Sequence, residues 1–216
     1  MLGRTNKGAG GRFRRIVTSL VMAVALPLGL AVAGTGATAN AAFDPRAFDF
    51  VVDSSMGPIK SRIWRAADGN TDRVVYLLDG LRATNDISGW EHETDAGAHL
   101  AANNINVVQP VGGMSSFYSD WYAPSNFNGQ QTTYKWETFL TQNLRNELAG
   151  RLGFNPNRNG VVGISMGGSA ALTMAAYYPD QFSYAGSLSG YLNISAPGMR
   201  EAMRLALLDS GRFNID

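Results

Sequence analysis

The sequence predicts an α/β fold, in which a mostly parallel sheet has helices on both faces and begins with an antiparallel pair of strands. Short apolar runs, bounded by Gly, Ser or Asp, alternate with longer stretches that carry apolar residues at helical spacing. Strands separated by helices of this length form βαβ units and hence parallel sheets. One early segment, 48–66, instead alternates apolar and polar residues around a turn, which favours an antiparallel pair at the edge of the sheet.

Each element has its own signal along the chain. The turn of the antiparallel pair is expected at Met56-Gly57-Pro58. Short, almost wholly apolar runs predict buried strands at 74–78, 105–111, 160–164 and 184–188. Apolar residues at helical spacing predict helices at 94–103, 136–152, 168–178 and 199–208. Pro179 ends the third of these helices.

The first 41 residues are typical of a secretory signal peptide. Five basic side chains precede the apolar run 16–33, and the small-residue cleavage pattern Ala39-Asn40-Ala41 follows it. A retained membrane anchor is the alternative, which the helix-breaking Pro27 disfavours. We therefore expect a secreted or envelope protein whose residues 42–216 form one esterase-like domain.

Composition excludes several classes of function. Beyond the leader, 13 basic and 17 acidic side chains leave a formal net charge of −4, which argues against nucleic acid as a partner. The chain has no cysteine, so it has no disulfide, no thiolate nucleophile and no Cys-based metal site. Its two histidines, His92 and His99, do not have metal-ligand spacing. We expect neither a metal nor another cofactor.

The strongest motif is Gly163-Ile164-Ser165-Met166-Gly167, which fits the G-x-S-x-G pattern of a nucleophile elbow between a strand and a helix. Such a turn is so sharp that side chains two positions from the serine would collide. It holds Ser165 in a strained conformation above the carboxyl edge of the sheet. A glycine-rich turn without chemistry is the alternative interpretation.

A second stretch, "LLDGLRA" at 77–83, ends the predicted strand 74–78 and can supply the other half of an oxyanion hole. The backbone N–H groups of Leu81 and Met166 are the predicted pair of donors. Asp79 and Arg82 of the same stretch offer fixed acceptors and donors for sugar hydroxyls, or form only a local surface ion pair.

Five stretches in the same order resemble the antigen 85-type mycolyltransferases, exported α/β-hydrolases of actinobacteria. They are "LLDGLRA", "VVQPVGGMSSFYSDWY", "YKWETFL", "GISMGGSAALTMAAYYPDQF" and "YAGSLSGYLN". The resemblance implies that a serine takes a mycoloyl group from trehalose monomycolate. The group then passes to another trehalose monomycolate, giving trehalose dimycolate, or to arabinogalactan. It also implies binding to a host matrix protein, and a monomer is expected.

The resemblance also implies roles for single residues. Ser165 is the nucleophile, Leu81 and Met166 supply the oxyanion hole, and Asp79 and Arg82 grip the sugar. Asn193 falls where relatives often carry an acidic residue in contact with substrate, and Glu93 replaces an asparagine of the sugar pocket. The long aromatic segment 112–136 is either an apolar wall for an acyl chain or packs onto its own domain.

The proton acceptor for Ser165 is the missing part of the motif. In the α/β-hydrolase fold an acidic residue and then a histidine follow the nucleophile, but no histidine follows Ser165. His92 and His99 precede it, and either could serve only in an order unlike that of the fold. We therefore expect the chain to be an N-terminal portion of the enzyme that lacks the last strands, leaves a sheet edge unpaired and has little turnover alone.

Two other functions stay open. A secreted carboxylesterase of the same fold would transfer the acyl group to water, because water and a sugar hydroxyl attack the same acyl-enzyme. A non-catalytic surface binding protein would also lack the acid and the histidine. Substrate identity follows from the family resemblance, and only the serine chemistry follows from the residues themselves.

Overall fold

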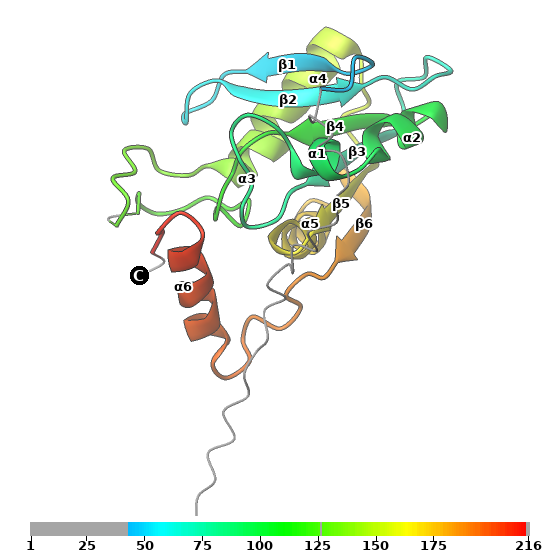
Figure 1. The fold of residues 1–216 in the computed structure, drawn as a ribbon. Helices are drawn as coiled ribbons and strands as arrows, with labels where there is room; N and C mark the ends of the chain where they lie inside the picture. The colour runs from blue at the N-terminus through cyan, green and yellow to red at the C-terminus, as the bar shows by residue number, and fades with distance from the viewer. Residues whose placement is uncertain (1–42, 126, 215–216) are drawn as a thin grey trace, which may run out of the picture. The chain divides into compact units, whose positions relative to one another are not determined.

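The computed structural model describes residues 43–125 and 127–214, and the predicted signal peptide lies outside them. The described residues form a six-stranded sheet with strand order β1-β2-β4-β3-β5-β6 (Figure 1). The strands are β1 (Phe48–Val52), β2 (Ile59–Trp64), β3 (Val74–Leu78), β4 (Asn106–Pro110), β5 (Asn159–Ile164) and β6 (Phe182–Leu188). β1 pairs with β2 and β2 with β4 in antiparallel fashion, and the other pairs are parallel. The predicted antiparallel start is confirmed.

The helices match the expected ones with one addition. They are α1 (Gly89–Glu93), α2 (Ala96–Ala102), α3 (Trp136–Thr138), α4 (Leu144–Leu152), α5 (Met166–Tyr177) and α6 (Met199–Asp209), with the π-helical turn η1 (Phe139–Asn143) joining α3 to α4. The addition is α1, which was not among the helices predicted from the sequence. Its signal was present, because Ser88 and Glu91 have the spacing of a capping box. The Ser88 hydroxyl does accept a hydrogen bond from the Trp90 amide, 3.2 Å away.

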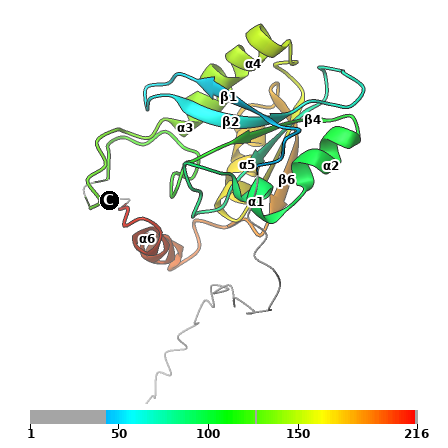
Figure 2. The same ribbon diagram turned by 45° about the horizontal axis from the view of Figure 1, so that its top comes forward.

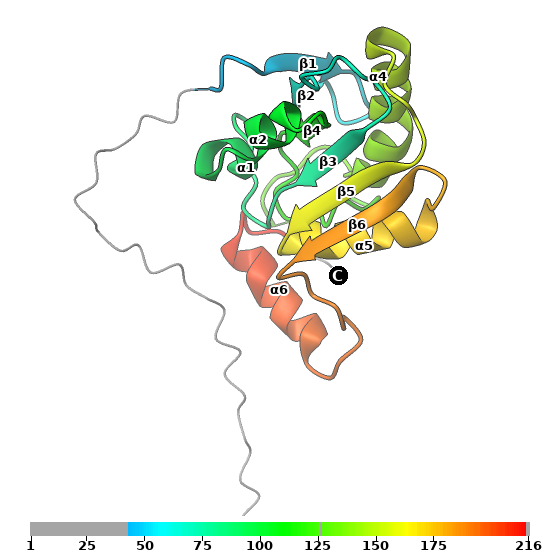
Figure 3. The same cartoon turned by 90° about the vertical axis from the view of Figure 1, so that its right-hand side faces the viewer.

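The central strand β3 shows why the sheet is covered on both faces. Val74, Tyr76 and Leu78 point to one face, where they join the core formed with α3, η1, α4 and α5. Val75 and Leu77 point to the other face and pack with residues of α2. A strand buried on both faces reads as a continuous apolar run, as this one does. Figure 3 shows α1 and α2 on one side of the sheet and α4 and α5 on the other.

The parallel strands position the site because their carboxyl ends lie at one edge of the sheet. In Figure 3 the arrowheads of β3, β5 and β6 point the same way, so the loop after β3 and the turn after β5 meet there. Within the described residues β6 forms a border of the sheet, and its Tyr184 and Leu188 are exposed. Across that described part, no helix has the length and apolarity needed to span a membrane.

Candidate active site around Ser165

Ser165 lies at a strained turn between β5 and α5. Its backbone has φ 52° and ψ −116°, a region that residues with a Cβ rarely adopt. Glycines on both sides allow this turn. A Cβ on Gly163 would lie 2.0 Å from the carbonyl oxygen of Gly167, and one on Gly167 would lie 2.4 Å from that of Leu78. The backbone geometry predicted from the motif is therefore present, and only glycine fits at these two positions.

Two backbone segments converge on Ser165. Met166 is the first residue of α5, so its N–H has no acceptor within the helix, and the positive end of the helix dipole lies at the same place. From the loop after β3, a Cβ built on Gly80 would lie 3.7 Å from the Cβ of Ser165. Leu81 follows directly in that loop. The fold thus brings Leu81 and Met166 to the serine, and their role as oxyanion donors stays a prediction.

Asp79 has a different environment from the one that its sugar-binding role suggests. Its side chain is buried, and its two oxygens accept hydrogen bonds from the Ser88 hydroxyl, 3.1 Å, and from the amides of Gly89, 3.1 Å, and Trp90, 3.3 Å. Burial raises the pKa of Asp79 to about 6, and these hydrogen bonds oppose the shift. The carboxylate holds the start of α1 in place, so any bond to a sugar must compete with three internal donors.

Arg82 does not pair with Asp79. Its guanidinium is exposed and forms an ion pair with Asp209 at the end of α6, a residue 127 positions later. The alternative of a local Asp79–Arg82 ion pair is therefore wrong. The physical reason is that the Asp79 carboxylate turns inward, toward the N–H groups of α1, whereas the Arg82 side chain extends into solvent.

A cavity of about 860 Å³ adjoins the elbow through Ile164, the residue before Ser165; Ser165, Leu81 and Met166 are not among the described residues that line it. Arg82, Ile164 and Leu188 contribute to its wall, and Asp79 and Gly80 contribute from the loop after β3. The rest of its lining comes mainly from the segment 83–94 and is a mixture of apolar, hydroxyl and charged side chains: Ala83, Thr84, Asp86, Ile87, Gly89, Trp90, His92, Glu93 and Thr94, with Phe43. This size and composition suit a ligand with both polar and apolar parts.

Among the predicted substrate residues, Asp79 and Arg82 lie on this cavity and Asn193 does not. Asn193 lies between β6 and α6, where its side chain is exposed, and it is not among the described residues that form the cavity wall. Glu93 does line the cavity. Figure 1 shows the segment that carries Asn193 running from the end of β6 to α6.

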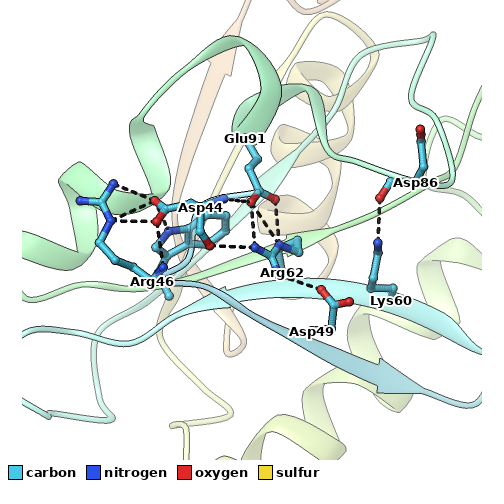
Figure 4. Close-up of polar contacts among 8 residues, drawn as sticks. Asp44, Arg46, Asp49, Lys60, Arg62, Asp86 and Glu91 are labelled. Atoms are coloured by element: carbon cyan, nitrogen blue, oxygen red, sulfur yellow. Dashed lines mark hydrogen bonds and ion pairs between the residues drawn. The ribbon is translucent and has the colours of Figure 1, made fainter. Parts of the chain in front are cut away.

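One wall of the cavity is held by a buried ionic network that the sequence analysis missed. The Arg62 side chain on β2 is 6% exposed and that of Glu91 on α1 is 2% exposed. Arg62 Nε lies 2.9 Å from Glu91 Oε2, and Arg62 Nη2 lies 2.9 Å from Glu91 Oε1. Arg62 also donates to Asp49 Oδ1, 2.8 Å, and to the carbonyl of Asp44, 3.0 Å (Figure 4).

The network fixes α1 against the sheet. Glu91 Oε1 accepts a further hydrogen bond from the Asp44 amide, 2.9 Å, and the Trp90 indole donates to the carbonyl of Leu78, 2.9 Å. Trp90 and Glu93, on the same helix, therefore meet the cavity in a defined orientation. Sequence reasoning could not find this pairing, because it joins residues 29 positions apart that no motif connects.

Both histidines are exposed on helices. His92 is exposed on α1, with Nδ1 2.7 Å from Glu93 Oε1, and lines the cavity. His99 is exposed on α2. Among the described residues, no hydrogen bond joins a histidine to the Ser165 hydroxyl.

Residues 65–206 match the family described as putative esterase. The chain belongs to this family. It is 42% identical over 215 residues to the diacylglycerol acyltransferase/mycolyltransferase Ag85C of Mycobacterium avium, a match that covers 98% of this chain and 60% of that protein. It is 45% identical over 213 residues to the protein of the same name from Mycobacterium leprae, with 96% and 62% covered. The family resemblance seen in the sequence is confirmed.

Solved structures agree with this assignment. MPT51 (FbpC1) of Mycobacterium tuberculosis has a TM-score of 0.65 and 33% identity to this esterase-family chain, covering 76% of this chain and 58% of that one. An S-formylglutathione hydrolase from Agrobacterium tumefaciens has a TM-score of 0.58 at 18% identity, which speaks for the fold alone. The predicted α/β-hydrolase fold is confirmed. The chain spans about 60% of the length of the curated relatives that it matches.

Proposed function

We propose that this chain carries the nucleophile and the oxyanion donors of a serine acyltransferase that moves a mycoloyl group between trehalose mycolates and onto arabinogalactan. The observation that carries the proposal is the strained Ser165 turn facing the Gly80-Leu81 loop beside a large cavity. Relatives at 42% and 45% identity that are named mycolyltransferases support the choice of acyl group.

The proposed chemistry follows from the geometry. The Ser165 hydroxyl attacks the ester carbonyl of the donor, and the negative charge that develops on the carbonyl oxygen is stabilised by the amides of Leu81 and Met166. The sugar alcohol of the donor leaves, and a second sugar hydroxyl then attacks the acyl-enzyme. A base must take the proton of Ser165, and no described residue is assigned to that step.

The cavity suits the sugar part of such a substrate. Its wall combines the indole of Trp90 with the hydroxyl of Thr84 and the charged groups of Arg82 and Glu93. These groups offer a flat apolar face together with donors and acceptors for hydroxyls. We also propose that the protein acts in the cell envelope or outside the cell, as the predicted signal peptide suggests. Amino-terminal sequencing of the exported protein would detect cleavage before Ala42.

The function is tested with trehalose monomycolate and radiolabelled trehalose. The protein should form labelled trehalose mycolate only slowly, because no described residue is assigned as the base. Ser165→Ala should form none, and Ser183→Ala, which changes an exposed serine on β6, should behave as the unaltered protein. Release of free acid alone would favour the secreted carboxylesterase. No turnover, no labelling of Ser165 by a fluorophosphonate and retained binding of the trehalose ester would favour a non-catalytic binding protein.

A further inference from the structure

The segment after β4 contains several residues in the left-handed backbone region. Ser115, Phe117 and Tyr118 have φ values of 57°, 53° and 50°, and Gly112 and Gly113 also have positive φ. Residues with a Cβ adopt this region only where contacts with the surrounding structure hold them in it. Such backbone strain is concentrated at functional sites. The contacts made by this segment therefore indicate what it is built to hold.

Its contacts reach both residues of the predicted oxyanion hole. The Ser115 amide donates to the carbonyl of Leu81, 2.9 Å, and the Phe117 amide lies 3.1 Å from the sulfur of Met166. The Tyr118 hydroxyl accepts a hydrogen bond from the Asp79 amide, 2.9 Å. One short strained segment thus contacts the loop after β3 and the residue that follows the nucleophile.

A second segment holds Leu81 from the other side. The Ser210 hydroxyl, just after α6, donates to the same carbonyl of Leu81, 3.1 Å. The Ser115 hydroxyl in turn donates to the carbonyl of Ser210, 2.6 Å. Ser115, Leu81 and Ser210 therefore form a closed ring of hydrogen bonds, and both serines are buried. Figure 2 shows the segment before α3 running toward the end of α6.

Holding this carbonyl constrains the neighbouring amide. A carbonyl oxygen has two lone pairs, and the two donors from Ser115 and Ser210 can occupy both of those of Leu81. The amide and the carbonyl of Leu81 belong to two planar peptide groups joined at its Cα. The first is held by the Ala83 amide, which donates to the carbonyl of Gly80, 3.2 Å, so holding the second limits the remaining rotation at Leu81. An oxyanion donor stabilises the transition state only when it is already oriented toward the developing charge.

We propose that Ser210, together with Ser115, is a positioning residue that keeps the Leu81 amide aimed at the oxyanion. The inference rests on the proposed acyl-transfer function and deepens it, because it assigns the orientation of one donor to a contact 129 residues away. Ser210 does not touch the reacting atoms; it acts through Leu81.

The test compares three variants. Ser210→Ala removes the hydroxyl, Ser210→Thr keeps one, and Ser125→Ala is the matched control. Ser125 is also buried and its hydroxyl bonds the same tail, at Asn214 Oδ1, 2.9 Å away, but among the described contacts it makes no hydrogen bond to Leu81 or Met166. The residual dipolar coupling of the Leu81 N–H, measured by NMR, reads the orientation of that bond and requires no turnover. It should change in Ser210→Ala and stay unchanged in the other two.

The catalytic readout is hydrolysis of a short-chain p-nitrophenyl ester. In Ser210→Ala, kcat should fall about fivefold to tenfold with KM unchanged, because a misaligned donor affects the transition state alone. Ser210→Thr should restore kcat. An unchanged dipolar coupling of the Leu81 N–H in Ser210→Ala, an equal kcat loss in Ser125→Ala, or a rise in KM in place of the kcat loss would each overturn the inference.

The two proposals fail in distinguishable ways. The p-nitrophenyl ester needs no sugar acceptor, so normal ester hydrolysis without transfer to trehalose counts against the proposed function alone. If the unaltered protein hydrolyses no ester, the proposed function again fails, and the dipolar coupling of the Leu81 N–H still decides whether Ser210 positions that amide.

Discussion

Replacing Glu91 by glutamine should severely destabilise the protein. The change removes the only carboxylate that meets both Nε and Nη2 of Arg62 among the described contacts, and the guanidinium is only 6% exposed. Asp49 remains as a partner but is itself half-exposed, so it compensates poorly. Removing one member of a buried ion pair costs about 3–5 kcal/mol in free energy of unfolding. For a domain of this size the melting temperature should fall by roughly 6–20 °C.

Urea denaturation, followed by tryptophan fluorescence, measures the effect. The matched control is Glu147→Gln, which breaks an exposed ion pair with Arg151 and should cost less than about 1 kcal/mol. The double variant Glu91→Leu with Arg62→Met should recover most of the lost stability, because it leaves no buried charge unpaired. A loss below about 1 kcal/mol for Glu91→Gln would refute the argument that this pair holds α1.

Three further predictions concern the elbow, Asp79 and the C-terminal tail. Gly167→Ala should lower the free energy of unfolding, measured by urea denaturation, by at least about 2 kcal/mol, because the added Cβ would lie 2.4 Å from a backbone carbonyl oxygen. It should also abolish fluorophosphonate labelling of Ser165, and normal labelling would contradict this. The pKa of Asp79 is raised from 3.8 to about 6, so folding is favoured while this carboxyl is protonated. The stabilisation is complete below pH 3.8 and is lost, by about 3 kcal/mol, as pH rises through 6. Asp79→Asn should remove this pH dependence from the free energy of unfolding, measured by urea denaturation between pH 4 and 7. If the stability of the variant changes with pH as much as that of the unaltered protein, the assignment is refuted. Phe213→Ala should lower the free energy of unfolding, measured by thermal unfolding, by about 3–4 kcal/mol, because the buried ring stacks on Tyr134 with 5.6 Å between ring centroids. A loss under about 1 kcal/mol would show that the tail is not anchored there.

Much of the fold could be predicted because its signals are local. The apolar runs of β3, β4, β5 and β6 and the helical spacing of α2, α4, α5 and α6 depend on residues a few positions apart. The short helix α1 was missed even though Ser88 and Glu91 have capping-box spacing. Five residues are too few to show a helical period, so a single cap was its only signal.

The amino-acid sequence alone determined the elbow at Ser165, since glycines within five residues of one another decide whether the backbone can make that turn. It also identified the loop that meets the serine, because parallel strands end at one edge of the sheet. Only the tertiary structure decided what the charged groups do. Asp79 binds the amides of α1, Arg82 pairs with Asp209, and Arg62 is buried against Glu91.

The physical reason is the distance along the chain over which each interaction acts. Steric limits on a turn involve adjacent residues, so they are written in the motif itself. A hydrogen bond or an ion pair is decided by which segments meet in space. Here those segments are separated by 29 positions at Arg62 and Glu91 and by 129 positions at Leu81 and Ser210.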